Sequence, residues 1–420
     1  MGAVPDTTTA GLTRADVLAH LSRHAAAPTT GPPRVGLAQA WHTYGLAEPG
    51  RHLPAAEVLH TATTLGPLPS GSTVAVEPGG QVALTTLPFD PWWESLEALR
   101  SDGAVLRGRL AGAGIVTVAA GLDPFRAPAR TLDDPRCEAM EAYFDGWGPA
   151  GRRMMASSAS IQVNIDTGPP DVGPSRWSLA HRLGPALAAA FACSPSRIFR
   201  SARLATWEEM DPTRTRPALR SGDPAADWGA YVLGARLMLL HDDRDPDHCR
   251  AVTTPMTFGD WVDEGLDGRR PALADLQHHC ATLFPPVRLR GRLELRWLDS
   301  LPAGLAETAC AAVCALLIDA EAGEQADRAC AGVATDWTEA ARQGSRDPAL
   351  AQAGAAALRL AADALSRTDA PSQYAVRAAA AAERWPARWR CPADDLEERL
   401  RRGEKVAQLA EPTSVVPLGR

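Results

Sequence analysis

Residues 287–297 carry the strongest pattern in the chain, Val-Arg-Leu-Arg-Gly-Arg-Leu-Glu-Leu-Arg-Trp. Alternate side chains of a β-strand point to the same side, about 6.6 Å apart. One side would carry Val287, Leu289, Gly291, Leu293, Leu295 and Trp297, and the other Arg288, Arg290, Arg292, Glu294 and Arg296. The pattern therefore predicts one continuous strand with four arginines and one glutamate on a single face.

Two interpretations of this charged face are open. It can be the solvated side of an edge strand, where charges prevent aggregation. It can also line a ligand-binding cleft, because the opposite side is apolar enough to anchor the strand in a core. The run of like charges favours the cleft, since it repels itself unless an anion compensates it.

A second strand, predicted at residues 161–166, has a polar side made of Gln162, Asn164 and Asp166. Alone, such a side is typical of any antiparallel sheet with one solvated face. Together with the arginine strand, it predicts a sheet whose polar face forms the floor of a site.

The rest of the chain divides into three expected parts: an N-terminal helix and linker (1–33), a sheet-containing core (34–302) and a helical C-terminal region (303–420). Thr13 and Asp16 are expected to cap a helix that runs to His24. Further strands are predicted at residues 35–37, 73–77, 81–86 and 115–119, and helices at 92–113, 136–147, 178–192 and in succession over 303–402.

Composition narrows the class of protein. The 420 residues are 45% hydrophobic and 22% charged, which excludes a disordered chain or a small disulfide scaffold. The net charge of −7 argues against nucleic acid as a partner. The start of the chain lacks a signal-peptide pattern, no apolar run is long enough for a membrane span, and the eight cysteines form no CxxC pair. We expect a cytoplasmic protein with reduced thiols.

Three segments resemble glutamate–cysteine ligases of the plant and actinobacterial type, and most closely the type that opens ergothioneine biosynthesis. They are Val76-Glu77-Pro78-Gly79-Gly80-Gln81, then Met154-Met155 with Ile161-Gln162-Val163-Asn164-Ile165-Asp166, and then Thr282-Leu283-Phe284-Pro285-Pro286-Val287-Arg288 with Leu293-Glu294-Leu295-Arg296. Weaker matches lie at residues 34–37, at Trp207 with Asp211, and at 258–263 and 391–395. The resemblance covers the chain from about Arg34 to Asp395.

The resemblance implies an α+β fold like that of glutamine synthetase, in which an antiparallel sheet forms a bowl with helices outside. It also implies ATP and magnesium as cofactors and a small-molecule amino acid or anionic metabolite as the partner, with no membrane or nucleic acid. Carried over residue by residue, it makes Glu294 and Arg296 catalytic and makes Glu77, Gln162 and Glu294 a weak remnant of a metal shell. The implied substrate-binding residues are Gln162, Asn164, Arg203, Trp207, Arg288, Arg290 and Arg292.

The chain departs from these ligases at three positions where they carry glutamates. Ala38 and Ala40 replace the two glutamates of the first strand, and Ala83 replaces a third after the Pro-Gly-Gly turn. Magnesium prefers oxygen ligands, so the site is expected to bind it poorly while its arginines still attract a carboxylate or phosphate. The alternative is that carboxylates come from other positions.

Two hypotheses follow: a working ligase that joins glutamate to cysteine, or a diverged homologue that has lost or altered the chemistry of ATP and magnesium. The three alanines favour the second.

Two smaller departures concern substrate and nucleophile. Leu204 and Ala205 stand where the resembled ligases carry more polar side chains, so substrate choice differs or is uncertain. Cys280 follows two histidines, which allows a thiol nucleophile. Neighbours in a helix do not face each other, however, so core packing is the favoured interpretation of Cys280.

Overall fold

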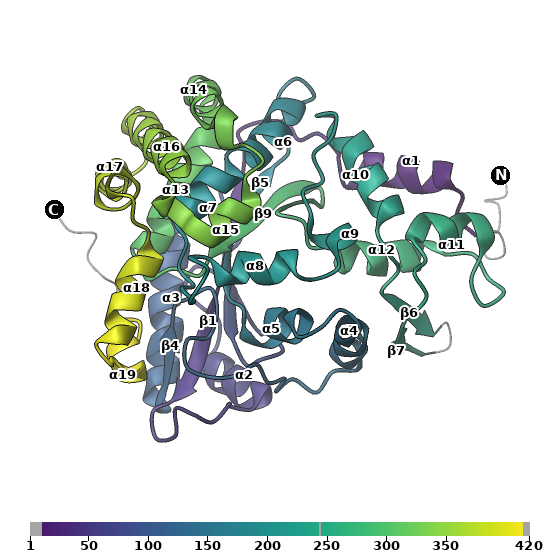
Figure 1. Ribbon diagram of the computed structural model, residues 1–420, viewed down its shortest axis with the longest axis horizontal. Helices are drawn as coiled ribbons and strands as arrows, with labels where there is room; N and C mark the ends of the chain where they lie inside the picture. Colours follow the sequence, from purple (N-terminus) through teal and green to yellow (C-terminus); the bar gives the residue numbers. More distant parts are fainter. Residues whose placement is uncertain (1–10, 243–244, 415–420) are drawn as a thin grey trace.

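A seven-stranded sheet lies at the centre of the computed structural model, which describes residues 11–242 and 245–414 (Figure 1). All of its neighbouring strands are antiparallel, in the order β2-β3-β1-β5-β9-β8, with β4 also pairing with β1. The strands are β1 (Val35–Gly45), β2 (Thr73–Val76), β3 (Val82–Thr85), β4 (Ile115–Val118), β5 (Ser160–Asp166), β8 (Val287–Leu289) and β9 (Arg292–Asp299). A separate hairpin joins β6 (Leu239–Asp242) to β7 (Asp245–Ala251). The expected α+β class with an antiparallel sheet is confirmed.

One face of the sheet is the core of the molecule. Leu37, Leu84, Val163 and Leu293 are each at most 1% exposed, and they alternate with residues that point to the other face. Helices α3 (Glu94–Gly112), α7 (Gly184–Ala190) and α13 (Leu305–Ile318) pack against this face through contacts with β1, β9 and β5. The burial of apolar side chains between these helices and the sheet is the main force that holds the two layers together.

Other helices surround this central pair of layers (Figure 1). At one end lie α1 (Arg14–His24), α10 (Pro224–Gly234), α11 (Phe258–Glu264) and α12 (Leu273–Ala281). The C-terminal helices, α14 (Ala320–Cys330), α15 (Trp337–Gln343), α16 (Pro348–Ser366), α17 (Gln373–Arg384), α18 (Pro392–Arg401) and α19 (Val406–Leu409), lie at the opposite side. The remainder are α2 (Ala55–Thr63), α4 (Pro135–Asp145), α5 (Ala150–Ser157), α6 (Gly173–Arg182), α8 (Ala202–Glu208) and α9 (Pro212–Thr215). No helix in these described ranges is long and apolar enough to cross a membrane.

The predicted N-terminal helix is confirmed together with its cap. Thr13 accepts a hydrogen bond from the backbone of Asp16, whose carboxylate accepts one from the backbone of Thr13, and α1 ends at His24. The helix predicted at residues 178–192 is in fact two helices. Pro185 sits in the first turn of α7, where its missing N–H costs nothing, and so begins a new helix after α6.

The single strand predicted over residues 287–297 is wrong: the segment is a hairpin. Strands β8 and β9 pair Arg288 with Glu294 and Leu289 with Leu293 around a turn centred on Gly291, whose φ is +68°. In this register, even-numbered residues face even-numbered residues across the turn. The alternation of charged and apolar side chains therefore runs through the turn without a break, and alternation alone cannot distinguish this hairpin from a longer strand.

Replacing Gly291 with alanine should destabilise the hairpin, because an L-residue in the left-handed region costs about 1–2 kcal/mol. We expect Gly291→Ala to lower the free energy of unfolding by that amount in a urea titration. Gly112→Ala is the matched control, since Gly112 ends helix α3 and an added methyl there meets no atom within 4 Å. Equal stability of the two variants would show that Gly291 does not need its positive φ.

Candidate functional site

The register of the sheet places most predicted site residues on its second face. Ala38 pairs with both Gln162 and Thr85, Ala40 pairs with Ala83, and Asn164 pairs with Glu294. Directly paired residues of antiparallel strands point to the same side. This side is partly open to solvent, since Ala38, Gln162 and Asn164 are half-buried and Thr85 is exposed. We call it the open face, defined by Ala38, Ala40, Ala83, Gln162, Asn164, Arg288, Glu294 and Arg296.

Glu294 lies on the open face between two guanidinium groups. Arg288 Nη2 donates to both carboxylate oxygens of Glu294, at 2.8 and 3.0 Å, and Arg296 Nη1 donates to Oε1. Burial acts to raise the pKa of Glu294, but Arg296 and Arg288 outweigh it and lower the pKa to about 2. The carboxylate is therefore ionised at neutral pH, and both of its oxygens already accept hydrogen bonds within the protein.

The two arginines of this cluster differ in how enclosed they are. Arg288 also donates to the carbonyl of Leu283 at 3.1 Å and is 6% exposed, and burial lowers its pKa to about 10. Arg296 is less enclosed, and its Nε is a buried donor without a partner among the described residues. Its guanidinium lies 5.6 Å from the ring centre of Trp207 and 5.8 Å from that of Phe284. Arg288 Nε is likewise a buried donor without a partner among the described residues, so the two arginines differ chiefly in that Arg296 is the more accessible to a ligand.

Glu77 reaches the same side from the end of β2. It follows Thr73 and Ala75 in alternation, and Ala75 pairs with Ala83. Its side chain keeps exposed surface, yet desolvation raises its pKa against the opposing charge of Arg296. Glu77 is therefore a further carboxylate on this side, close enough to Arg296 for their charges to interact.

The Pro-Gly-Gly turn fixes the position of Glu77. A Cβ added at Gly79 would stand 2.0 Å from the carbonyl oxygen of Ala156, so only glycine lets the turn touch the end of α5. Gln81 reinforces this contact, because its Nε2 donates to the carbonyl of Ser158 at 2.9 Å.

Arg203 is a buried structural group next to the open face. It is 1% exposed, its Nη1 lies 3.4 Å from Asp299 Oδ1, and its Nη2 donates to the carbonyl of Arg296. Asp299 also accepts from the backbone of Cys193 at 2.8 Å and from Ser194 Oγ at 2.7 Å. Arg203 therefore holds the backbone of β9 in place, while Trp207, one turn along α8, contacts the side chain of Arg296.

The two arginines nearest the turn differ: Arg290 points elsewhere, whereas Arg292 contacts the edge of the open face. Arg290 is exposed beside Gly291, and with His20, His24 and Cys280 it lines a small cavity on another part of the surface. The expectation that all four arginines share one cleft is therefore wrong for Arg290. Arg292 is exposed at the start of β9, and its Nε donates to Asn164 Oδ1 at 2.8 Å.

Cys280 is a poor nucleophile in this environment. It is half-buried in α12, and desolvation raises the pKa of its thiol to about 12, although Arg288 and Arg290 oppose the shift. The thiolate is the reactive form of cysteine. The packing interpretation therefore fits the structure better.

The side chains of the open face do not fit a magnesium ion. Magnesium takes hard oxygen ligands in near-octahedral geometry. Ala38, Ala40 and Ala83 present methyl groups, and the carboxylate of Glu294 is engaged by two arginines. Within the described residues there is no group of three or more histidine, cysteine, aspartate or glutamate side chains that could hold a metal.

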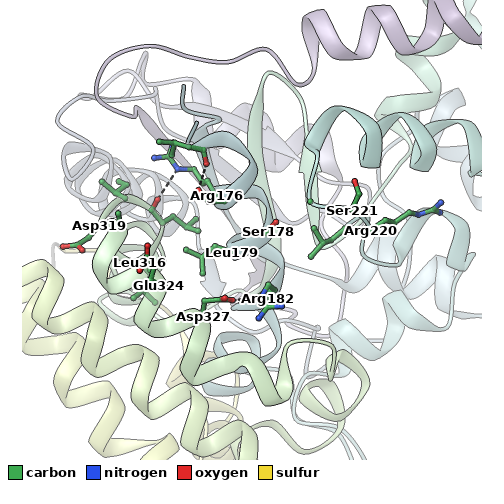
Figure 2. Close-up of a pocket in the computed structure, with 18 residues that line it drawn as sticks. Arg176, Ser178, Leu179, Arg182, Arg220, Ser221, Leu316, Asp319, Glu324 and Asp327 are labelled. Carbon is green, nitrogen blue, oxygen red and sulfur yellow. Dashed lines mark hydrogen bonds and ion pairs between the residues drawn. The ribbon is translucent and has the colours of Figure 1, made fainter. Parts of the chain in front are cut away.

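A cavity of about 610 Å³ lies away from the open face, between α6, α13 and α14 (Figure 2). Most of its charged groups are paired within the protein. Arg182 Nε donates to Asp327 at 2.5 Å, and the buried Arg176 donates to the carbonyls of Leu317 and Asp166 at 3.1 and 2.9 Å. We therefore locate the candidate site at the open face.

Sequence reasoning missed two residues that shape the site. Asp299 organises the Arg203 network through partners about a hundred residues away, which no local pattern reveals. Phe284 packs at 5.5 Å against Trp207 beneath Arg296. Phe284 belongs to the segment Thr282–Arg288, which resembles the ligases. An aromatic residue directly before two prolines was the local sign that it contributes to the site.

Comparisons with known proteins agree with the motifs. The model of glutamate–cysteine ligase family 2 (GCS2) matches residues 36–412. The glutamate–cysteine ligase EgtA of Mycobacterium tuberculosis is 40% identical over 378 residues, which cover 87% of this chain and 86% of that protein. EgtA of Mycolicibacterium smegmatis is 39% identical over the same length. A chloroplastic glutamate–cysteine ligase of Medicago truncatula is 27% identical over 55% of this chain and 47% of its own.

A solved structure shares the fold. The bifunctional glutathione synthetase of Pasteurella multocida superimposes with a TM-score of 0.51 at 15% identity, over 94% of this chain and 52% of that one. The glutamine-synthetase-like fold expected from the motifs is thereby confirmed.

The ionised Glu294 should make stability depend on pH. Its pKa of about 2 lies below the ordinary value of 4.5, so its contribution is present above about pH 4.5 and is lost as pH falls toward 2. At pH 7, Glu294→Gln should cost about 3–5 kcal/mol, because it leaves two buried arginines without their carboxylate. The gap to the wild type should narrow by about 2 kcal/mol by pH 3, as measured by denaturant unfolding.

Glu48→Gln is the control for this series, since Glu48 forms an exposed ion pair with Arg51. Its stability should follow the wild type at every pH. A gap between Glu294→Gln and the wild type that stays constant from pH 7 to pH 3 would contradict the low pKa.

Proposed function

Because the chain belongs to glutamate–cysteine ligase family 2, we propose that it is a diverged homologue in which the ligase chemistry of ATP and magnesium is lost or altered. The family acts on small amino acids such as glutamate and cysteine and generally uses ATP and magnesium. The proposed protein binds or acts on an anionic small molecule of the γ-glutamyl or amino-acid type, in thiol or natural-product biosynthesis.

One observation carries this proposal: the open face combines three alanines with a glutamate that is already bound by two arginines. In phosphoryl transfer, the metal ions and positioned cations supply most of the charge stabilisation. The described side chains offer the cations but not the carboxylates that would hold a metal. This supports a site that recognises anions directly.

The charges of the site favour a carboxylate or phosphate ligand. Within the cluster, Arg296 and Arg288 carry two positive charges against the one of Glu294, and Glu77 is the further carboxylate whose charge interacts with that of Arg296. The Nε of each arginine is a buried donor without a partner among the described residues, and the half-buried Gln162 lies on the same face. A guanidinium binds a carboxylate in a forked, charge-assisted geometry, and an amide can add one further donor.

The alternative is an active ligase that makes γ-glutamylcysteine for ergothioneine biosynthesis. The identity of 40% to the mycobacterial ligase EgtA over most of the chain favours it. The two proposals differ in what magnesium-ATP does at the open face.

Calorimetric titration with magnesium-ATP and an assay of ADP release separate the two. With glutamate, cysteine and ATP, we expect no ADP release above a boiled control, because three methyl groups replace the side chains that would hold magnesium. The triple variant Ala38→Glu, Ala40→Glu, Ala83→Glu should restore magnesium binding, seen as a magnesium-dependent rise in melting temperature.

The matched control adds three glutamates on exposed helix positions, Ala56→Glu, Ala379→Glu and Ala380→Glu, and should show no such rise. Wild-type turnover within tenfold of an ordinary ligase would overturn the proposal in favour of the alternative. A folded triple variant that does not respond to magnesium would remove the assignment of these three positions to a metal-facing site.

Arg296 should dominate the binding of anions without magnesium. Titrated with glutarate and with inorganic phosphate, Arg296→Ala should bind about ten- to a hundredfold more weakly than the wild type, because a charge-assisted contact of about 1.5–3 kcal/mol is lost. Arg296→Lys should recover part of the affinity, since an ammonium cannot fork. Arg290→Ala is the control, because Arg290 is exposed beyond the turn, and it should bind like the wild type. Unchanged affinity in Arg296→Ala would leave the arginines as solvated surface charges.

A further inference from the structure

A cavity of about 380 Å³ has Trp207 as one of its walls and contains none of the three alanines in its lining. It is lined by Leu204, Trp207, Glu208, Thr215, Arg216, Pro217, Pro286, Thr335, Trp337 and Thr338. This volume is within the range of small-molecule binding sites in proteins, about 300–1,000 Å³. Two indoles, two prolines and a leucine make up half of its lining residues, and the other half are polar.

A narrow crevice of about 20 Å³ lies between this cavity and the arginines of the open face. It is lined in part by Arg203, Phe284 and Arg296, and it shares Leu204, Trp207, Thr215 and Pro286 with the larger cavity. The shared walls make the two hollows neighbours. The crevice itself has room for about one water-sized group.

The two tryptophans of the cavity are held by packing. A Cβ added at Gly184 would stand 2.1 Å from Cη2 of Trp337, so α7 leaves space for this indole only because residue 184 is glycine. Trp207 packs against both the guanidinium of Arg296 and the ring of Phe284, which also lie near each other. Rigid aromatic walls favour flat or bulky apolar groups, because little side-chain entropy is lost on binding.

The polar residues that line the cavity restrict the charge of a ligand group bound near them. Glu208 is exposed, accepts a hydrogen bond from Thr338 Oγ1 at 3.0 Å, and lies near the cation Arg216. This part of the lining has one charge of each sign and so offers no net attraction for a second anion. The strong cationic centre of the region is at the inner end, at Arg296.

We propose that this cavity binds an aromatic or bulky aliphatic group of the same ligand whose anionic end binds Arg296. The inference rests on the proposed function and specifies its substrate class: an acid with an apolar body, rather than a compact molecule such as cysteine. Leu204 and Trp337 act as residues that determine specificity.

Three probes test this inference by calorimetric titration of the full chain: propanoate, 3-phenylpropanoate and the neutral 3-phenylpropanamide. The wild type should bind 3-phenylpropanoate at least tenfold more tightly than propanoate. Thr335→Trp, which fills the cavity from an exposed position, should reduce that ratio to about one, and Leu204→Gln should lower it. Thr64→Trp, on an exposed threonine far from the cavity, should keep the ratio of the wild type.

The amide separates failure of this inference from failure of the proposed function. Equal affinity for propanoate and 3-phenylpropanoate in the wild type, with both weakened by Arg296→Ala, would overturn the inference and leave the anion site intact. Equal affinity for acid and amide, with both weakened by Thr335→Trp, would support the cavity and count against recognition of the anion by Arg296. Phenyl-dependent binding that Thr335→Trp leaves unchanged would overturn the inference.

Discussion

The carboxylate of Glu294 is held by two guanidinium groups, and much of the site takes its shape from this contact. Arg288 comes from β8 and Arg296 from β9, so their shared acceptor connects the two strands on the open face. Arg288 also binds the carbonyl of Leu283, which places the segment that carries Phe284. Phe284 in turn supports Trp207. A buried ion cluster of this kind contributes little net stability, but removing one member leaves costly unpaired charges, and so it fixes geometry strongly.

The faces of the sheet could be predicted from the sequence, but its connections could not. Alternation correctly grouped Gln162, Asn164, Glu294 and Arg296 on one side, because the side-chain period of a strand is two in any register. The turn at Gly291 was missed because even-numbered residues pair with even-numbered residues across it, so the charged and apolar side chains alternate as they would in one straight strand. A glycine within an otherwise regular pattern was the one local signal for it.

Most of the residue roles that could not be predicted from the sequence depend on partners far away in the chain. Arg203 has the motif context of a substrate-binding residue, yet its charge is compensated by Asp299, ninety-six positions away in the chain. Cys280 has the neighbours of a nucleophile, yet the fold desolvates its thiol. In both cases the side chain's role follows from burial, and burial depends on tertiary packing that a single sequence does not specify.

Trp207 borders two parts of the site: the charged cluster at Arg296 and the 380 Å³ cavity. One side of the indole meets Arg296, and the residue also lines the 380 Å³ cavity. Any substitution that tilts this ring therefore changes the reach of the guanidinium and the shape of the apolar space together. In the proposed ligand complex, a substitution at Trp207 would therefore alter both the affinity for the anionic group and the selectivity for the apolar group. Thr335 and Thr338 line the same cavity and are exposed, so packing constrains substitutions there less than it does at Trp207.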